Sequence, residues 1–293
     1  MKKAPFTGSG VAIVTPFDGN KTNYEAFGEI IEQQISGGTD AIIVCGTTGE
    51  AATMPDAEHL VAIKYAVEKT AGRIPVIAGT GSNDTVHAVY LSQKAEEYGA
   101  DGILTVTPYY NKTSQHGLIK HFKTIAESIS IPVILYNVPS RTGMAISIDT
   151  LKELAKIPNV VGIKEASGDI SYAAKVAAEI PELNIYSGND DMIVPMLSLG
   201  AKGVISVLAN VMPKETHDIC ALYFEGKTDM SRQLQLKLLK LINDLFIEVN
   251  PVPVKTAMRL MGFNVGELRA PLCDMTDEHL AVLKAEMKKQ GLL

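Results

Sequence analysis

The sequence predicts an α/β fold, with a closed (β/α)8 TIM barrel over residues 1–226 and a helical C-terminal region over residues 227–293. Short apolar, β-branched runs alternate with helical patterns, which is typical of parallel strands joined by right-handed crossovers. Eight such units over roughly 225 residues match the size of a closed barrel, and a doubly wound open sheet is the second choice. Beyond Lys227 no strand pattern is found.

Each expected strand is a short apolar run that ends at a group of turn-forming residues. Pro16 and the Asp18-Gly19-Asn20 turn close the first strand, and a glycine-rich segment, Gly46 to Gly49, follows the second. The expected strands are 11–15, 41–45, 74–78, 102–106, 132–136, 160–164, 184–187 and 203–207.

The segments between these strands have helical periodicity and suitable end signals. Gly37-Gly38 stops the first helix, Pro55 starts the second, and Asp169 is a candidate N-cap for the sixth. The expected helices are 24–36, 55–70, 84–98, 115–128, 147–156, 169–179, one that ends at Leu199, and 213–224, followed in the C-terminal region by 230–249, 254–261 and 277–289. We expect that region to pack on the barrel or on a partner subunit.

Composition and charge exclude several classes of protein. Of the 293 residues, 46% are hydrophobic and 20% charged, so the chain can bury a sizeable core. The net charge of -6, with no basic run, argues against a nucleic-acid partner. No apolar segment follows the first lysines and no run of about 18 apolar residues occurs, so we expect neither a signal peptide nor a membrane span.

The cysteine pattern indicates a reducing compartment. Cys45, Cys220 and Cys273 are scattered and odd in number, which is untypical of a disulfide framework or of a CxxC metal site. We therefore expect a cytoplasmic protein.

The run from Val160 to Asp169 is the most informative stretch, because a buried-strand pattern ends there in a lysine, Lys164. Burial of an ammonium lowers its pKa, and a lysine that is neutral near pH 7 forms Schiff bases with carbonyl compounds. Side-chain alternation is expected to place Val160 and Gly162 on the same face as Lys164. Two other interpretations stay open: a head group in water, or a structural ion pair with Glu165.

Other expected strand ends carry residues suited to the same chemistry. Thr47 and Thr48 lie between glycines, where hydroxyls and backbone N–H groups could hold a carboxylate. Tyr109, Tyr110 and Tyr136 are candidate proton carriers, and Arg141 could bind a carboxylate bidentately. Considered alone, the Thr47–Thr48 segment is better explained as an ordinary glycine-rich turn. Each tyrosine is also consistent with packing at a strand end or a subunit interface, and Arg141 with a solvated loop charge. Together they are what a Schiff-base aldolase acting on an oxo acid requires.

Competing chemistries find less support. The Gly79-Thr80-Gly81 segment has Asp84 where a dinucleotide-binding motif needs its third glycine. The six histidines are dispersed without metal-ligand spacing, so no metal site is expected. Cys45 could be a nucleophile with His59 as its base, although a small apolar strand residue is the better interpretation.

Four motifs also show a family resemblance. They are Gly46-Thr47-Thr48-Gly49-Glu50, Thr107-Pro108-Tyr109-Tyr110-Asn111, Tyr136-Asn137-Val138-Pro139-Ser140-Arg141-Thr142-Gly143 and Gly162-Ile163-Lys164-Glu165-Ala166-Ser167-Gly168. In this order, and over nearly the whole chain, the sequence resembles the dihydrodipicolinate synthase family, of the Schiff-base-forming pyruvate aldolase superfamily. The resemblance implies a (β/α)8 barrel and a homotetramer built as a dimer of tight dimers.

The resemblance also implies an activity, in which pyruvate and L-aspartate 4-semialdehyde condense to 4-hydroxy-tetrahydrodipicolinate on the route to diaminopimelate and lysine. No metal or organic cofactor takes part. The implied roles are a Schiff base on Lys164, a proton relay of Tyr136, Thr47 and a neighbouring subunit's Tyr110, pyruvate binding by Thr48, a pocket lined by Gly188 and Ile205, and semialdehyde binding by Arg141.

Two alternatives remain. Related aldolases of the N-acetylneuraminate lyase and 2-keto-3-deoxygluconate type share the lysine, the tyrosine and the glycine-threonine loop. Arg141 favours the synthase, because an anionic second substrate needs a guanidinium whereas a sugar chain needs neutral hydrogen-bonding groups. A catalytically silent barrel that binds an oxo acid is the other alternative.

The resemblance also suggests an allosteric lysine site. This chain keeps His59, Asn83 and Tyr109 of that site, but has Asp56 where sensitive relatives often have His and His87 where they have Glu. Loss of an acidic partner weakens binding of amino groups, so we expect weak or absent inhibition by lysine.

Overall fold

The computed structural model describes residues 2–293 and contains a closed barrel of eight parallel strands. Around the barrel the order is β1-β10-β9-β8-β7-β6-β5-β4, so β1 pairs with both β4 and β10 and closes the sheet. The barrel strands are β1 (Gly8–Ala12), β4 (Ala41–Val44), β5 (Val76–Gly79), β6 (Gly102–Val106), β7 (Val133–Asn137), β8 (Val160–Glu165), β9 (Asn184–Ser187) and β10 (Gly203–Ser206). The predicted fold class is confirmed.

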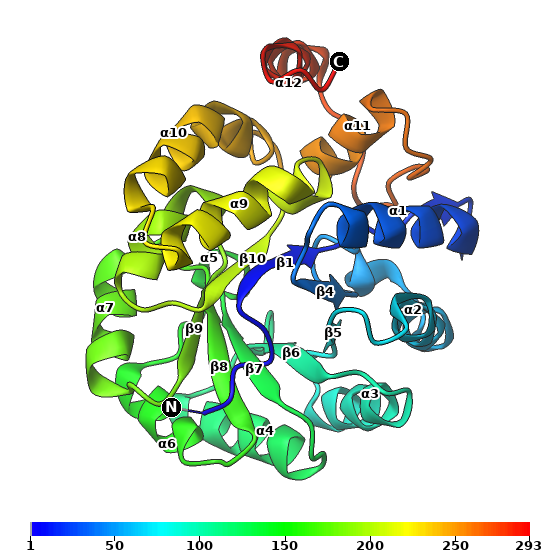
Figure 1. Cartoon of the computed structure of the whole chain (residues 1–293). Coiled ribbons are helices and arrows are strands. Elements are labelled where there is room, and N and C mark those ends of the chain that lie inside the picture. Colours follow the sequence, from blue (N-terminus) through cyan, green and yellow to red (C-terminus); the bar gives the residue numbers. More distant parts are fainter. Residues whose placement is uncertain (1) are drawn as a thin grey trace.

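Helices surround the strands as an outer ring (Figure 1). They are α1 (Tyr24–Ser36), α2 (Asp56–Thr70), α3 (Thr85–Glu97), α4 (Gln115–Glu127), α6 (Ile148–Ala155), α7 (Ile170–Glu179), α8 (Ile193–Ser198) and α9 (Pro213–Phe224). Shorter elements that the periodicity did not predict occupy the loops: the hairpin β2 (Phe17–Asp18) and β3 (Lys21–Thr22), helix α5 (Pro139–Thr142), and the 3₁₀ helices η1 (Ala51–Thr53), η2 (Asp190–Met192) and η3 (Leu208–Asn210). Asp169 caps α7 as predicted, accepting from the backbone N–H groups of Ser171 and Tyr172 at 2.8 and 3.1 Å.

The first strand begins three residues earlier than predicted, at Gly8 rather than Val11. Glycines in a strand interior normally weaken it, so the Gly8-Ser9-Gly10 segment gives no strand signal. Here Gly10 is required by packing, because a Cβ at this position would lie 2.6 Å from the side chain of Ile43 and 2.8 Å from that of Phe6. Close packing inside the barrel therefore overrides the local preference.

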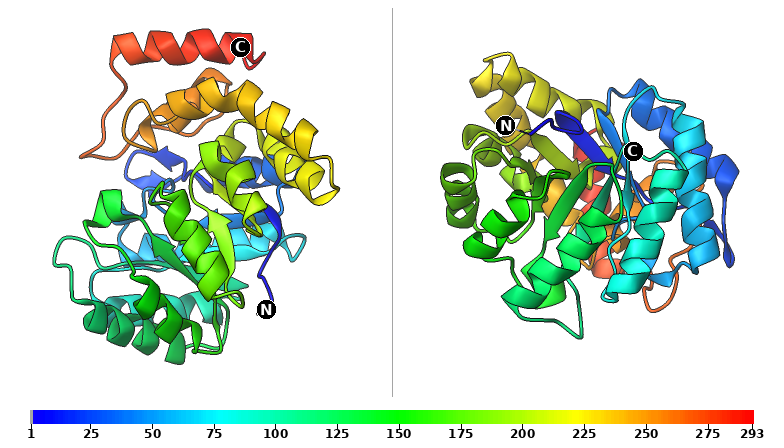
Figure 2. Two further views of the ribbon diagram at one scale, coloured as in Figure 1. Left: turned by 90° about the vertical axis from the view of Figure 1, so that its left-hand side faces the viewer. Right: turned by 90° about the horizontal axis from the view of Figure 1, so that it is seen from below.

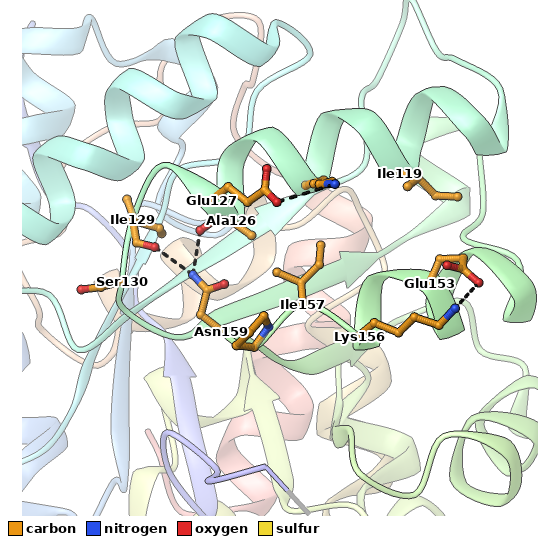
Figure 3. A pocket seen from close by; sticks show the side chains of 11 residues that line it. Ile119, Ala126, Glu127, Ile129, Ser130, Glu153, Lys156, Ile157 and Asn159 are labelled. Atoms are coloured by element: carbon orange, nitrogen blue, oxygen red, sulfur yellow. Dashed lines mark hydrogen bonds and ion pairs between the residues drawn. The ribbon is translucent and has the colours of Figure 1, made fainter.

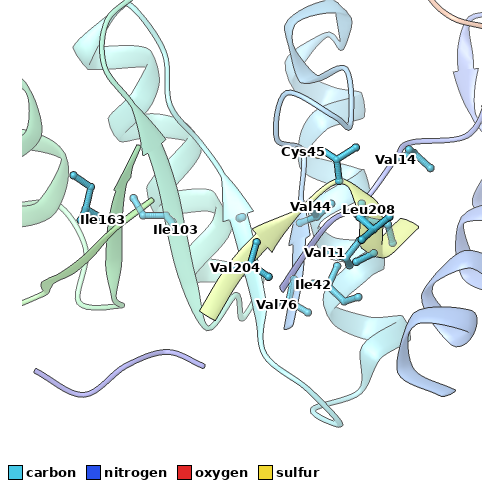
Figure 4. Close-up of a cluster of buried hydrophobic side chains, with 14 of the residues drawn as sticks. Val11, Val14, Ile42, Val44, Cys45, Val76, Ile103, Ile163, Val204 and Leu208 are labelled. Atoms are coloured by element: carbon cyan, nitrogen blue, oxygen red, sulfur yellow. The ribbon is translucent and has the colours of Figure 1, made fainter. Parts of the chain in front are cut away.

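Apolar side chains form two concentric layers. The outer layer fills the space between strands and helices and includes Val11, Ile42 and Val204 (Figure 4). The inner layer fills the barrel itself, and there the ring of Phe6 stacks on that of Tyr186 with centroids 4.5 Å apart. The Tyr186 hydroxyl donates to the Phe6 carbonyl at 2.7 Å, so this pair fills the barrel where the chain enters β1.

A bulge in β8 changes which residues share a face with Lys164. Val133 pairs with Val160, but the next residue of β7 pairs with Gly162, so one extra residue is inserted in β8. Val160 therefore packs in the outer layer with Ile163, and the prediction that it shares a face with Lys164 is wrong. Gly162 and Lys164 keep their inward orientation.

The C-terminal region is helical, as predicted, and consists of α10 (Thr228–Asp244), α11 (Val252–Leu260) and α12 (Asp277–Lys289). It lies over one end of the barrel, on the side away from the N-terminus (Figure 2). No helix within residues 2–293 has the length and apolar character that a membrane crossing requires.

A buried ion pair fastens this region to the barrel. Lys255 of α11 is fully buried, and its Nζ lies 2.7 Å from Oε1 of Glu50 and 3.0 Å from the carbonyl of Glu267. The other Glu50 oxygen accepts from the backbone N–H of Arg269 at 3.0 Å. Since Glu50 ends the Gly46–Glu50 loop, the pair joins α11 directly to one of the predicted site motifs.

We expect Lys255→Met to lower the free energy of unfolding by about 3–5 kcal/mol, because it leaves the Glu50 carboxylate buried without its cation. Chemical denaturation followed by circular dichroism measures this change. Lys64→Met is the matched control, since it removes a lysine from an exposed pair with Glu68 and should alter stability by about 0.5 kcal/mol or less. Similar effects of the two substitutions would contradict the anchoring role of Lys255.

Candidate active site

A cavity of about 760 Å³ opens at the C-terminal ends of the barrel strands. Catalytic groups of such barrels are found at this end. Most of the residues predicted from the strand ends line it, and the link between α10 and α11 forms part of its wall. Its lining includes Thr47, Thr48, Tyr136, Arg141, Lys164, Gly188 and Asn250.

Lys164 lies on the inner face of β8 and pairs across the sheet with Tyr136 of β7. Its side chain is only 7% exposed, and its Nζ lies 4.4 Å from the centroid of the Tyr136 ring. Burial lowers the pKa of the ammonium to about 8; the charge of Asp190 opposes this shift and that of Arg141 adds to it. The interpretation that this head group lies in water is therefore wrong.

Glu165 is not the ionic partner of Lys164, so that alternative is wrong too. Its carboxylate accepts from Nδ2 of Asn137 at 2.7 Å and from the backbone N–H of Ser167 at 2.6 Å. The amide oxygen of Asn137 in turn accepts from the backbone N–H of Ile146 at 3.1 Å. Glu165 thus joins the ends of β7 and β8 from outside and leaves the amine of Lys164 without a close carboxylate.

Tyr136 presents a phenol that stays protonated. Burial raises its pKa, against the positive charge of Arg141 and a hydrogen bond with Thr47. Thr47 is solvent-accessible at the cavity surface, whereas Tyr136 is buried. The structure therefore brings Lys164, Tyr136 and Thr47 together as predicted.

Two potential anion-binding groups, Thr48 and Arg141, also line the cavity. Thr48 is buried and its Oγ1 accepts from Nδ2 of Asn250 at 3.0 Å. Arg141, in α5, is exposed at the rim and donates from Nη2 to the carbonyl of Asn250 at 3.2 Å. Asn250 was missed from the sequence, because an Asn-Pro pair after a helix signals only a turn.

Of the two residues expected to line the pocket, Gly188 does so and Ile205 does not. A Cβ at Gly188 would lie 2.5 Å from that of Ala166 and 3.1 Å from Cε of Lys164, so a glycine leaves room for the lysine side chain. Ile205 is fully buried in the inner layer of the barrel with Tyr136 and is not among the residues that line the cavity.

Asp190 is a second residue that sequence reasoning missed. It is buried in η2, and its Oδ2 accepts from the backbone N–H groups of Val207 and Leu208, both at 3.0 Å. Its Oδ1 is buried without a hydrogen-bond partner. Burial raises the pKa of this carboxyl, and the charge of Lys164 opposes the shift. The Asp190-Asp191 pair gave no signal, because acidic residues in a loop are usually solvated.

The adjacent tyrosines Tyr109 and Tyr110 differ in their position relative to the cavity. Tyr109 lines the cavity, whereas Tyr110 adopts a positive φ of 68° and is 93% exposed. The structure does not bring Tyr110 to the cavity of its own chain.

Of the residues predicted for an effector site, His59 and Tyr109 line the cavity, whereas Asn83 does not. His59 is buried, its Nε2 lies 2.8 Å from the carbonyl of Gly79, and burial lowers its pKa. Asn83 donates to the carbonyl of Tyr109 at 3.2 Å. His87 and Asp56 pair at 2.9 Å, so the carboxylate of Asp56 already has a partner.

Cys45 is not an activated nucleophile. Its thiol is buried and contacts the carbonyl of His59, and burial raises its pKa. Among residues 2–293, no three His, Cys, Asp or Glu side chains converge as a metal site would need.

A second hollow, of about 640 Å³, lies between α4 and α6, away from these groups (Figure 3). Its charged side chains are paired with each other, Lys123 with Glu127 and Lys156 with Glu153. It gathers no nucleophile or proton carrier, so the cavity at the strand ends is the candidate active site.

Comparisons with known proteins agree with this assignment. A model of the dihydrodipicolinate synthetase family matches residues 5–290. The chain is 59% identical to 4-hydroxy-tetrahydrodipicolinate synthase of Acetivibrio thermocellus, over the full length of both chains. It superposes on the crystal structure of the Aquifex aeolicus dihydrodipicolinate synthase with a TM-score of 0.96 and 46% identity, covering 98% of this chain and 99% of that one. A Cyanidioschyzon merolae relative with lysine bound gives a TM-score of 0.96 at 37% identity, covering 99% and 100% of the two chains.

We expect the trapping of pyruvate on Lys164 to accelerate with pH and to level off above about pH 8, because only a neutral amine can attack a carbonyl carbon. Asp190→Asn removes a negative charge that raises the Lys164 pKa but keeps an oxygen for Val207 and Leu208. It should move the midpoint to lower pH by about one unit. Cyanoborohydride trapping, quantified by intact mass across the pH range, measures the midpoint.

Asp191→Asn is the matched control, since Asp191 is the adjacent but exposed carboxylate. Its midpoint should stay where it is in the unmodified chain. An unchanged midpoint in Asp190→Asn would mean that Asp190 only supports the Val207–Leu208 turn.

Proposed function

This chain belongs to the dihydrodipicolinate synthetase family, and we propose that its cavity performs the family's reaction through a Schiff base on Lys164. The chain is a lyase that condenses pyruvate with L-aspartate 4-semialdehyde to 4-hydroxy-tetrahydrodipicolinate, in diaminopimelate and lysine biosynthesis. The observation that carries the proposed mechanism is the buried Lys164, with its lowered pKa, facing Tyr136 in the cavity.

In this mechanism the neutral Nζ of Lys164 attacks the keto carbon of pyruvate, and water leaves to give an imine. Loss of a methyl proton converts the imine to an enamine. The enamine carbon attacks the aldehyde carbon of the second substrate, and the aldehyde oxygen gains a proton. The amino group of that substrate then attacks the imine carbon and displaces Lys164, which closes the ring and frees the enzyme.

Tyr136 and Thr47 would carry the protons. Because burial keeps the phenol of Tyr136 protonated, it can give a proton to the leaving water or to the aldehyde oxygen and be reprotonated from Thr47. Thr47 is solvent-accessible, so it can pass protons between the buried phenol and the outside.

Thr48 and Arg141 would hold the two carboxylates. Thr48 accepts from Asn250, so its own hydroxyl proton is free to donate to the carboxylate of pyruvate. The guanidinium of Arg141 at the rim suits the carboxylate of the second substrate. Gly188 would leave room for the side chain of Lys164, and Ile205 would contribute to the buried inner layer that contains Tyr136.

The proposed reaction uses no metal or organic cofactor, because the protonated imine withdraws the electrons that a metal would otherwise stabilise. A biosynthetic enzyme with these substrates belongs in the cytoplasm, where we place this chain.

Tyr110 supports an oligomer. Tyr110 is 93% exposed, adopts a positive φ beside the cavity-lining Tyr109, and does not itself line the cavity of its own chain. We infer that it enters the cavity of a second copy and joins Tyr136 and Thr47 in the proton relay, within a tetramer of two tight dimers. Val86 and Tyr90 of α3 are also exposed and apolar, as an interface requires.

The first experiment is cyanoborohydride reduction in the presence of pyruvate, followed by intact mass and peptide mapping. A pyruvate adduct on Lys164, absent from Lys164→Arg, is the expected outcome, and it would rule out a catalytically silent barrel. A folded protein without an adduct would overturn the Schiff-base mechanism.

We expect Tyr110→Phe and Lys164→Arg each to be nearly inactive, and their mixture to regain activity after subunit exchange. In a mixed dimer, the site that keeps Lys164 receives Tyr110 from the other chain and is complete. Steady-state assay of the exchanged mixture measures this recovery. The absence of recovery, with mixed dimers demonstrated by native mass spectrometry, would show that Tyr110 does not act across subunits.

We expect half-inhibition by lysine only above about 1 mM, because Asp56 is already paired with His87 where the effector's ammonium would need a free carboxylate. His87→Glu restores an acidic group and should lower the inhibitory concentration, whereas His116→Glu, on α4, should not. Sub-millimolar inhibition of the unmodified chain would refute the expectation.

A further inference from the structure

Asn250 lies between the two predicted carboxylate-binding groups. It occupies the link between α10 and α11, outside the barrel strands, yet it lines the cavity. Its side-chain Nδ2 donates to Oγ1 of Thr48 at 3.0 Å, and its carbonyl accepts from Nη2 of Arg141 at 3.2 Å. One residue of the helical region therefore contacts both groups.

The amide oxygen of Asn250 has no partner. The residue is 6% exposed and this Oδ1 is buried, but no donor within residues 2–293 reaches it. Of the buried, unpaired side-chain polar atoms that the structure describes in these residues, this is the one carried by a residue lining the cavity. An unpaired buried acceptor is unfavourable, and such groups in native proteins generally have a functional or bound partner.

The surroundings indicate which kind of donor the oxygen would meet. The second substrate is an α-amino acid, whose ammonium is one carbon away from its carboxylate. If Arg141 binds that carboxylate, an acceptor beside the guanidinium meets the ammonium. Asn250 is such a neighbour: its backbone carbonyl accepts from the Arg141 guanidinium, and the unpaired Oδ1 belongs to the side chain of the same residue.

The carboxylates that line the cavity are already engaged. Glu50 accepts from Lys255 at 2.7 Å and from the backbone of Arg269, and Asp56 pairs with His87. The side-chain Oδ1 of Asn250, by contrast, has no hydrogen-bond partner and is free to accept from a bound molecule.

We propose that Asn250 determines specificity for an amino-bearing semialdehyde, its Oδ1 accepting a hydrogen bond from the α-ammonium while Arg141 holds the α-carboxylate. The inference rests on the proposed function and adds to it a reason why the substrate's amino group is recognised before it reacts. A site built to pair with a substrate N–H discriminates strongly against an analogue without it, because the acceptor is then left unpaired.

The test compares aspartate 4-semialdehyde with succinic semialdehyde, which has the same chain and carboxylate but no amino group. The KM of the first and the inhibition constant of the second, as a competitor, are measured at saturating pyruvate. In the unmodified enzyme, the desamino compound should bind about tenfold more weakly or worse, as expected for one lost hydrogen bond to a charged group. Equal affinities would overturn the proposal without any variant.

Asn250→Ala should raise the KM for aspartate 4-semialdehyde about tenfold or more and the inhibition constant of succinic semialdehyde less than about threefold. Asn250→Asp keeps an acceptor and should retain the preference for the amino compound. Equal loss for both compounds in Asn250→Ala would mean that Asn250 only positions Arg141.

Two control variants separate the other contacts. Arg141→Ala should weaken both semialdehydes by a similar factor, since both have the carboxylate, and should affect the KM for pyruvate far less. Thr48→Ala should weaken pyruvate and leave the ratio between the semialdehydes unchanged. Failure of the proposed function is distinguishable, because it would appear as absence of the pyruvate adduct on Lys164 in the unmodified enzyme.

Discussion

The site depends on an amine that is held out of water without a close countercharge. Lys164 is surrounded by the barrel wall and the ring of Tyr136, and Glu165, the next residue, is directed away by its bonds to Asn137 and Ser167. If Glu165 paired with the amine, the charged form would be favoured, and Lys164 could not act as the proposed nucleophile. The alternation of side chains along β8, which places adjacent residues on opposite faces, is thus a condition for the chemistry.

Two charged residues that do not contact Lys164 directly, Asp190 and Arg141, affect its pKa. Asp190 stabilises the ammonium and Arg141 destabilises it, so the pKa reflects a balance between burial and two opposing charges. Asp190 is fixed by the backbone of Val207 and Leu208, and Arg141 by the carbonyl of Asn250. The elements that hold these charges are loops and the helical region, so the barrel alone does not define the site.

The site residues that could be predicted from the sequence are those that lie at or near the end of an apolar run. Lys164 and Tyr136 end apolar runs, whereas Thr47 and Arg141 follow such runs two and five residues later. The rule that parallel strand ends meet at one side of a barrel was sufficient to bring them together. The β8 bulge was not predictable, because the extra residue appears only when β7 and β8 are paired.

Asn250 and Asp190 were missed for a related reason. Asn250 is 109 residues from Arg141 and 202 from Thr48, and its importance lies in contacts that no local pattern encodes. Asp190 was missed because its charge affects the pKa of Lys164 only through its burial near the lysine, which the sequence does not show. Ile205 was expected on the cavity wall but belongs to the buried inner layer of the barrel and is not among the residues that line the cavity.

The stacked rings of Phe6 and Tyr186 determine from which end of the barrel substrates can enter the cavity. Because these rings fill the barrel at the end where β1 begins, the cavity has its mouth at the opposite end. Lys164 is buried within it and Arg141 is exposed at the rim, so a molecule bound to Arg141 stands in the path to the lysine. If both substrates pass through this mouth, we expect the keto acid to bind first, and we expect a rim-bound acid to obstruct its entry rather than compete with it for the amine.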